Sequence, residues 1–123
     1  MRILITDLNT KIHKDLEKKS AGSGVELEIY KTANDITDQS WNKAHGIITY
    51  RCSKNVMDAI SKINNTKIVV RGGVGFDGLD LDKLGQKGIA VCTVPDYGTT
   101  EVADHAIGLM LMIRRGLDQY DKL

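Results

Sequence analysis

Five short apolar segments rich in β-branched residues recur along the chain, and stretches with helix-forming character separate them. This regular alternation is typical of α/β proteins. Two of the segments, around Ile47-Ile48 and Ile68-Val69-Val70, are apolar without interruption, as expected of parallel strands covered by helices on both faces. The sequence therefore predicts a parallel sheet between helices, with strands over 2–6, 25–30, 46–50, 67–71 and 89–93 and helices over 10–20, 37–43, 54–63 and 79–84.

The size and charge of the chain narrow its class. Its 123 residues, 41% of them hydrophobic, suffice for one ordinary domain with its own core. Seventeen Lys and Arg face sixteen Asp and Glu, and the net charge of +1 carries no long block of one sign. We therefore expect neither nucleic acid nor a membrane surface as a partner.

Targeting and metal signals are weak. The longest apolar run, residues 106–113, is far shorter than the roughly 20 residues of a membrane-spanning helix. The apolar start of the chain is too short for a signal peptide. Cys52 and Cys92 are far apart and show no metal-ligand spacing, so we expect no disulfide and no metal site. The expected location is the cytoplasm.

The last segment predicts the longest helix, over residues 99–115. Thr99 or Thr100 can act as its N-cap, and Arg114, Arg115 and Gly116 are typical of a C-terminus. Its apolar residues lie nearly all round the helix, since they form two adjacent rows and part of a third side. The short domain can cover only one of these sides. We therefore expect a partner surface outside these residues and predict a homodimer through residues 99–115.

A glycine-rich loop follows the fourth predicted strand. Residues 71–78 contain a literal G-x-G-x-x-G, but a dinucleotide site needs a crossover helix as long as the sheet, and here the next helix ends by Gly85. Two interpretations remain. The loop is a tight turn that needs positive φ angles, or its consecutive backbone N–H groups form a concave anion site that holds a carboxylate.

The position of this loop favours a ligand site. Ligands of parallel α/β sheets bind beyond the carboxyl ends of the strands. Arg51, Cys52 and Ser53 follow one predicted strand, and residues 73–75 follow its predicted neighbour. One carboxylate could contact both loops, through backbone N–H donors and the charge of Arg51.

Several ordered motifs carry a resemblance to a known family. They are Arg71-Gly72-Gly73-Val74-Gly75-Phe76-Asp77-Gly78-Leu79-Asp80, Lys87-Gly88-Ile89-Ala90-Val91, Val94-Pro95-Asp96-Tyr97-Gly98 and Glu101-Val102-Ala103-Asp104-His105-Ala106. The chain resembles the D-2-hydroxyacid dehydrogenase family, which includes phosphoglycerate dehydrogenase. Gly78 and Thr93 depart from this pattern, because the family often has Asn there. The likeness implies a flavodoxin-like, three-layer substrate-binding domain over residues 1–98, with a five-stranded parallel sheet. Residues 99–123 would form the long helix that leads toward a separate nucleotide-binding domain.

The resemblance also implies site residues. A small 2-hydroxy or 2-keto carboxylate would be bound by Arg51, Cys52, Gly73, Gly75 and Gly98. In a complete enzyme, Val74 and Thr99 would lie beside the nicotinamide of NAD.

The reaction of the family needs more than this domain. Hydride transfer requires a nicotinamide carrier, a cation that polarises the keto acid and an acid/base group. The family's Arg and its Glu-paired His lie in the nucleotide-binding domain or beyond it. We expect that this sequence, which ends at Leu123, does not include that domain. His105 follows Asp104 directly, and adjacent helix positions point about 100° apart, so these two do not form a catalytic pair. We expect this chain alone to carry no catalytic residue and to bind no NAD.

Three functions are compared. The first is the substrate-binding domain of an NAD-dependent D-2-hydroxyacid dehydrogenase, inactive by itself. The second is a non-enzymatic interaction module built on the same fold. The third is a receiver-like signalling domain, suggested by Asp7 after the first strand, but the third strand ends in Thr49-Tyr50-Arg51 without a phosphorylatable Asp. Cys52, beside Arg51, is either a reactive thiol or a buried or merely small residue.

Overall fold

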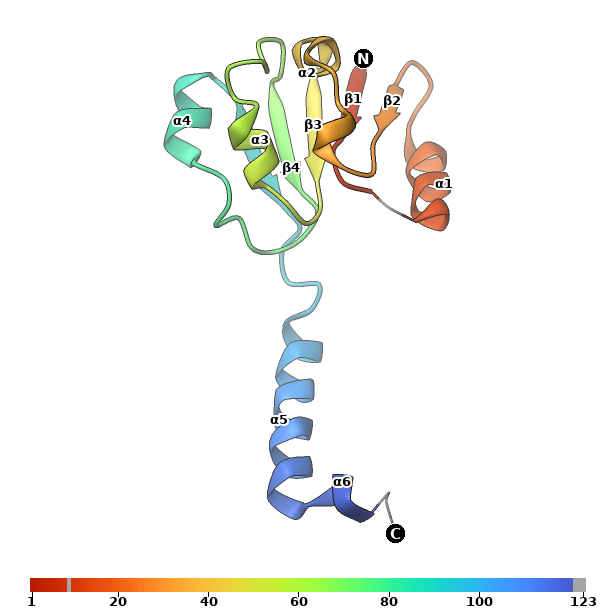
Figure 1. Ribbon diagram of the computed structural model, residues 1–123, viewed down its shortest axis with the longest axis vertical. Coiled ribbons are helices and arrows are strands. Elements are labelled where there is room, and N and C mark those ends of the chain that lie inside the picture. The colour runs from red at the N-terminus through yellow and green to blue at the C-terminus, as the bar shows by residue number, and fades with distance from the viewer. Residues whose placement is uncertain (9, 121–123) are drawn as a thin grey trace.

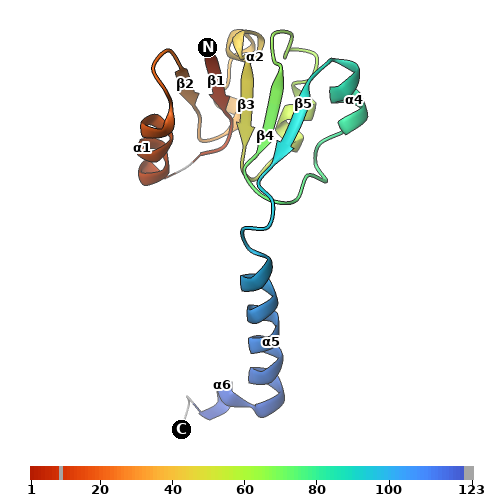
Figure 2. The same cartoon turned by 180° about the vertical axis from the view of Figure 1, so that it is seen from behind.

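A single parallel sheet forms the centre of the domain. The computed structural model describes residues 1–8 and 10–120, with the side chains of Ile12, Asp118 and Gln119 left out. The strands are β1 (Arg2–Ile5), β2 (Glu26–Ile29), β3 (Gly46–Thr49), β4 (Ile68–Arg71) and β5 (Ala90–Thr93). They pair in the order β2-β1-β3-β4-β5, all parallel. Figure 1 shows β1 to β4, and Figure 2, turned by 180°, labels all five strands in this order. The predicted α/β class and the five-stranded parallel sheet are confirmed.

Helices α1 to α4 lie between the strands in the chain, and α5 and α6 follow the last strand. They are α1 (Lys11–Ser20), α2 (Asp38–Lys43), α3 (Lys54–Asp58), α4 (Leu81–Gln86), α5 (Thr99–Arg115) and α6 (Leu117–Tyr120), with one 3₁₀ turn, η1 (Ala33–Asp35). The helix predicted over 54–63 is wrong in its second half. The backbone N–H of Lys62 donates to the carbonyl of Ala59 at 2.8 Å in a tighter turn. This turn brings Ile63, which is 1% exposed, into the core.

One face of the sheet carries the hydrophobic core. Leu4, Ile47 and Val69 come from the three central strands and are fully buried. They pack with residues of the helices that follow, in one cluster that includes Trp41 of α2 and Leu84 of α4. These contacts hold α2, α3 and α4 over this face.

The other face is covered less completely than predicted. Ile48, Ile68 and Val70 are only half-buried there, and Ala90 is exposed. Figure 2 shows β3, β4 and β5 from this side with no helix drawn across them. A hollow of about 220 Å³ lies between α1 and the strands. The prediction of helices on both faces is therefore wrong for β3, β4 and β5, because α1 is the one described helix on this face and it does not lie over these strands.

Helix α5 leaves the domain. It follows β5, the edge strand, and extends away from the carboxyl ends of the strands (Figures 1 and 2). None of its residues is buried, so the expectation that the domain covers one of its sides is wrong. The prediction of Thr99 or Thr100 as N-cap is wrong, because the helix already begins at Thr99 and its N-cap is Gly98, which offers no side-chain hydrogen bond. Gly116 ends the helix at φ +63°, as predicted.

Within the described ranges, no helix has both the length and the apolar character that crossing a membrane requires.

Candidate functional site

The loops that follow β3 and β4 meet at the carboxyl edge of the sheet. The last residues of the two strands, Thr49 and Arg71, are register partners, and the Gly72 N–H donates to the Thr49 carbonyl at 2.8 Å. Beyond this point lies a shallow pocket of about 290 Å³. Its lining residues are Arg51, Cys52, Ser53, Lys54, Arg71, Gly75, Asp77 and Gly78. The predicted meeting of the two loops is confirmed.

The glycines of the loop after β4 permit close approach rather than unusual backbone angles. The described glycines with positive φ are Gly24, Gly88 and Gly116, so the predicted positive-φ turn at 72–78 is wrong. A Cβ on Gly72 would lie 2.5 Å from ring carbons of Tyr50, and one on Gly78 would lie 3.0 Å from the Cβ of Ser53. A Cβ on Gly73 would collide with the Arg71 guanidinium. Side chains at Gly72 or Gly78 would push the two loops apart, whereas one at Gly73 would displace the guanidinium of Arg71.

Asp7 fixes the loop after β3. It follows β1, which pairs with β3, and its carboxylate accepts hydrogen bonds from three consecutive backbone N–H groups. Oδ1 accepts from Tyr50 at 2.8 Å, and Oδ2 accepts from Arg51 at 2.6 Å and from Cys52 at 2.9 Å. Burial raises the pKa of Asp7, but the backbone hydrogen bonds and that from Thr6 outweigh it, so the pKa lies below its usual value.

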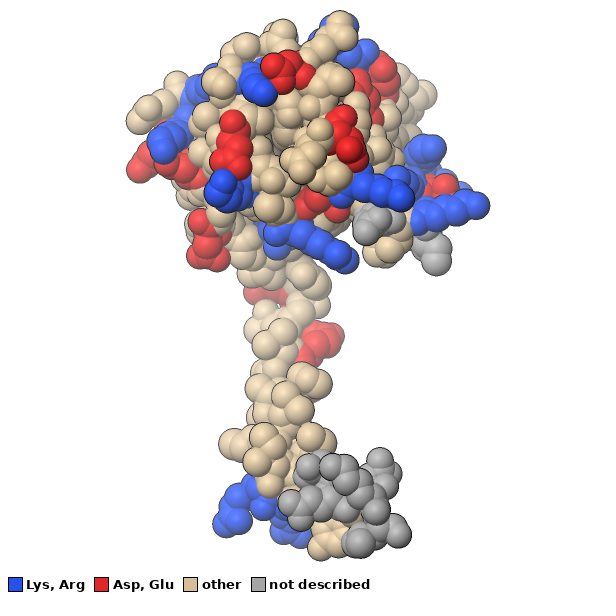
Figure 3. Space-filling model, viewed as in Figure 1, with Lys and Arg blue, Asp and Glu red and all other residues tan. Residues whose placement is uncertain are grey.

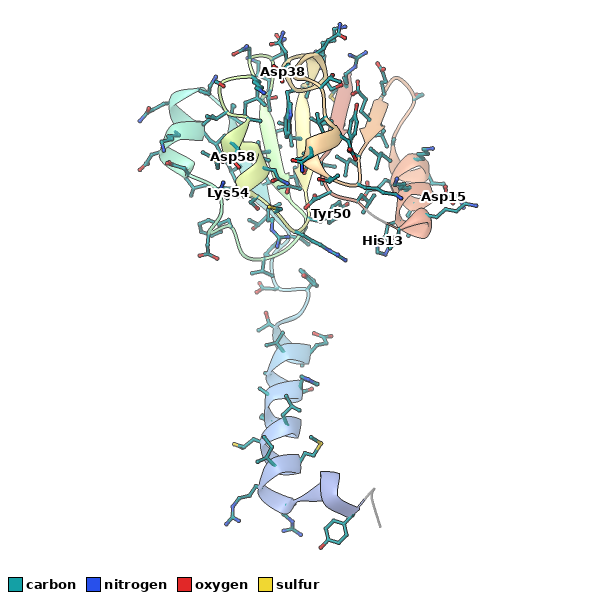
Figure 4. The ribbon with its side chains drawn as sticks, in the orientation of Figure 1. His13, Asp15, Asp38, Tyr50, Lys54 and Asp58 are labelled. Carbon is teal, nitrogen blue, oxygen red and sulfur yellow. The ribbon has the colours of Figure 1, made fainter. Side chains whose placement is uncertain are left out.

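Tyr50 ties the same loop to α1. Its hydroxyl donates to the carboxylate of Glu17, while its ring lies against Gly72. Burial, followed by the hydrogen bond to Glu17, raises the pKa of Tyr50 above its usual value, so the phenol stays protonated. Figure 4 labels Tyr50 at the end of β3 and Lys54 on α3. Asp7 and Tyr50 together hold this loop from both sides.

The backbone donors differ from those expected. The N–H groups of Arg51 and Cys52 donate to Asp7, and the Gly73 N–H donates to the Arg71 carbonyl at 2.8 Å. Among the glycines assigned to the site, Gly75 keeps an N–H with no hydrogen-bond acceptor in the described part of the chain. A carboxylate at this pocket would therefore meet side chains and the N–H groups of residues 74–78, which have no hydrogen-bond acceptor in the described part of the chain, but not those of Arg51, Cys52 and Gly73.

The pocket carries more positive than negative charge. Arg51, Lys54 and Arg71 line it together with one acidic residue, Asp77. The Lys54 ammonium pairs with Asp58 at 2.8 Å on α3, and both are labelled in Figure 4. Between described residues, neither Arg51 nor Arg71 forms an ion pair. The two guanidinium groups are suited to an anion, because they can offer charged N–H donors in a planar array.

Of the other expected residues, Cys52 lines this pocket, whereas Val74, Gly98 and Thr99 do not. Val74 is 49% exposed at the tip of the loop after β4. Gly98 and Thr99 lie where α5 begins, and the Val94 N–H joins the start of that connection to the Gly73 carbonyl at 3.1 Å. Cys52 is exposed, so burial is wrong for it, while its interpretation as a merely small residue stays a prediction. Its thiol donates to Asn55 Oδ1 at 3.4 Å. Over residues 1–8 and 10–120, no cluster of His, Cys, Asp and Glu could hold a metal ion.

Sequence reasoning missed two residues of the site. The sequence pattern points to Asp7 only as the acid after the first strand of a receiver-like domain, although an acid that closely follows a strand, beside a neighbouring strand's loop, is also a signal for a loop anchor. Arg71 was treated only as the end of a strand, yet its guanidinium lies across Gly73 and lines the pocket.

A family model matches this architecture and site. Residues 3–114 match the catalytic domain of the D-isomer specific 2-hydroxyacid dehydrogenases, and the chain belongs to this family.

Individual relatives agree with this assignment. The chain is 31% identical over 120 residues to the D-3-phosphoglycerate dehydrogenase of Methanocaldococcus jannaschii, covering 97% of this chain and 22% of that protein. The chain therefore spans less than a quarter of that relative. The structure of D-lactate dehydrogenase from Aquifex aeolicus, which contains NAD and lactic acid, superposes with a TM-score of 0.78 at 27% identity, over 98% of this chain and 37% of the other. A glyoxylate/hydroxypyruvate reductase from Sinorhizobium meliloti, with citrate, gives 0.77 at 30% identity and the same coverage.

Proposed function

We propose that this domain binds the substrate of an NAD-dependent D-2-hydroxyacid dehydrogenase of the phosphoglycerate dehydrogenase type. The ligand is a small 2-hydroxy or 2-keto carboxylate. The observation that carries this proposal is the pocket between the loops after β3 and β4, where Arg51 and Arg71 accompany the free N–H of Gly75. Carboxylate ligands in the structures of similar proteins, lactic acid and citrate, support it.

Some of these residues contact the substrate, and others shape the loops around it. Arg51 supplies charge, and Gly75 supplies a backbone donor to the substrate carboxylate. Cys52 and Gly73 shape the two loops, since their N–H groups have acceptors inside the domain. In a complete enzyme, Gly98 faces the substrate across the cleft, while Val74 and Thr99 lie beside the nicotinamide.

The residues of this chain do not fit NAD by themselves. The glycine loop runs into Leu79 and Asp80 before the six-residue helix α4, so no long helix presents its N-terminus to a pyrophosphate. NAD binding and the hydride step therefore require groups outside this domain. We expect the isolated chain to be inactive and to bind no cofactor.

The second candidate function is an interaction module, and the exposure of α5 favours it. Along its middle, Figure 3 shows few charged side chains, with acidic ones nearer the domain and basic ones at the far end. Ile107, Met110 and Leu111 are 52%, 61% and 52% exposed. We propose that a second copy of the chain covers this surface in a homodimer through residues 99–115. Both roles can coexist in one protein.

The cysteines bear on location. Cys52 and Cys92 are both free and exposed, which suits a reducing compartment and supports the cytoplasm as the proposed location.

A titration with pyruvate, followed by NMR of backbone amides and arginine side chains, tests the binding proposal. We expect millimolar affinity, because no second domain closes over the ligand and excludes water. Shifts should centre on Gly75, Arg51 and Arg71. Arg51→Gln should weaken binding several-fold, whereas Lys18→Gln on α1 serves as a control that removes the same charge elsewhere. Shifts confined to another surface would contradict the assignment.

A further inference from the structure

We propose that Asp7 is a positioning residue for the substrate pocket, because its carboxylate sets the conformation of the loop that carries Arg51 and Ser53 into the lining. That the pocket binds substrate rests on the proposed function. The positioning itself rests on hydrogen bonds that the structure shows.

Each carboxylate oxygen of Asp7 accepts two hydrogen bonds. Oδ1 accepts from the Tyr50 N–H and from the Thr6 hydroxyl, at 2.8 Å and 3.1 Å. Oδ2 accepts from the N–H groups of Arg51 and Cys52. Three of these four donors are consecutive backbone groups that lie 43 to 45 residues away in the sequence. A single side chain just beyond β1 thus defines the path of the chain immediately after β3.

Only an ionised acid satisfies this set of donors. An Asn at position 7 would place its NH₂ group either against the Tyr50 N–H or against both Arg51 and Cys52, and two donors cannot pair. The Thr6 hydroxyl can rotate to accept instead, so the less costly orientation keeps the amide oxygen toward Arg51 and Cys52. We therefore expect Asp7→Asn to release the Tyr50 amide first.

Loss of this anchor has a direct consequence for the pocket. Since the backbone N–H groups of residues 50–52 donate to Asp7, these three residues offer side chains rather than backbone donors to a ligand. Arg51 and Ser53 line the pocket, and Ser53 also packs against Gly78 of the facing loop. A loop without its anchor would present Arg51 in many conformations, and ordering it on binding would lower affinity.

The first experiment measures hydrogen exchange of individual amides in the wild type and in Asp7→Asn. The control is Asp80→Asn, which alters a carboxylate that accepts the Lys83 N–H at the start of α4, away from Asp7. We expect Asp7→Asn to lose protection selectively at residues 50–52 while β1 and β3 stay protected. Asp80→Asn should leave residues 50–52 unchanged. A uniform loss over the whole domain, or full protection at residues 50–52, would overturn the proposal.

The second experiment measures pyruvate affinity of the same variants by NMR. We expect Asp7→Asn to bind about tenfold more weakly, comparable to the loss of one charge-assisted hydrogen bond, and Asp80→Asn to bind as the wild type does. Unchanged affinity in Asp7→Asn would overturn the positioning role. If Asp7→Asn does not fold, Asp7→Glu replaces it, because it keeps the charge but moves it by one methylene. The proposal then requires altered amide shifts at residues 50–52 and weaker pyruvate binding, and wild-type affinity contradicts it.

A different result would contradict the proposed function rather than the role of Asp7. If the wild type itself gives no response to pyruvate at this pocket, the proposed function is wrong. The exchange of the amides of residues 50–52 in Asp7→Asn then still decides whether Asp7 positions the loop.

Discussion

The ring of Tyr50 and the backbone of Gly72 are in such close contact that a methyl group on Gly72 would lie 2.5 Å from two ring carbons. Tyr50 belongs to the loop after β3 and Gly72 to the loop after β4, so this contact sets the spacing of the two loops that form the pocket. Tyr50 cannot withdraw freely, since Asp7 holds its N–H and Glu17 accepts from its hydroxyl.

The first prediction concerns the glycines of this loop. Gly72→Ala should destabilise the domain by about 1–3 kcal/mol, because the added methyl overpacks against a ring that is held from two sides. Gly75→Ala is the matched control. Its Cβ would meet only Asp77 Oδ2 at 3.5 Å, an ordinary contact, and its cost should stay within about 0.5 kcal/mol. Urea unfolding measures both, and equal stabilities of the two variants would contradict the contact.

The second prediction compares two buried threonines. The Thr49 hydroxyl is buried at the end of β3 without a hydrogen-bond partner among the described residues. Thr49→Val should therefore leave stability unchanged or raise it by up to about 1 kcal/mol. The Thr66 hydroxyl donates to the Ala44 carbonyl at 2.9 Å, so Thr66→Val should cost about 1–2 kcal/mol. Thermal unfolding of both variants checks the contrast, and a larger loss in Thr49→Val would show that its hydroxyl has a partner.

The third prediction is the pH dependence that Asp7 contributes. Its pKa in the folded chain lies below the ordinary value of 3.8, because the backbone hydrogen bonds outweigh the effect of burial. The unfolded chain binds a proton first as the pH falls. The stabilisation is therefore complete above 3.8 and is lost as the pH falls from there through the lower native value.

The measurement is the free energy of unfolding of the wild type and of Asp7→Asn between pH 7 and pH 2. The difference between the two proteins should be constant near neutrality and shrink in acid. A difference that grows in acid would have the wrong sign and would contradict this account.

The fourth prediction is that the purified chain binds neither NAD nor NADH measurably, because the glycine loop offers no long helix N-terminus to the pyrophosphate. Isothermal titration calorimetry is the measurement. Saturable micromolar binding of NADH that Gly75→Val abolishes would show that the literal glycine motif is a true nucleotide site.

The fifth prediction concerns α5. Burial of about 600 Å² of its apolar surface would supply on the order of 15 kcal/mol before the costs of association are subtracted, which is ample for a dimer. Sedimentation should show a dimer for the wild type and a monomer for Leu111→Glu. The control is Leu16→Glu on α1, where the leucine is 55% exposed, close to the 52% of Leu111. A wild type that stays monomeric at tens of micromolar would rule out pairing through this helix.

The strand pattern was predictable because it is local. Continuous apolar runs such as Ile68-Val69-Val70 indicate buried parallel strands, and all five strands lie within the predicted segments. The end of α5 was equally local, since Gly116 after Arg114 and Arg115 is a C-terminal signal in itself. The predicted length of helix α3 is too great, because the chain leaves the helix early to bury Ile63 in the core, and this depends on tertiary packing.

By itself, the sequence determined the α/β class, the order of the elements and the two loops where a ligand site should lie, because strand periodicity and the carboxyl-edge rule depend on the chain alone. Tertiary structure decided the rest. The partners of Asp7 lie 43 to 45 residues away, so only the pairing of β1 with β3 brings them together. The direction of α5 likewise follows from where β5 lies in the sheet. Its apolar residues indicate burial, but periodicity cannot say which surface covers them.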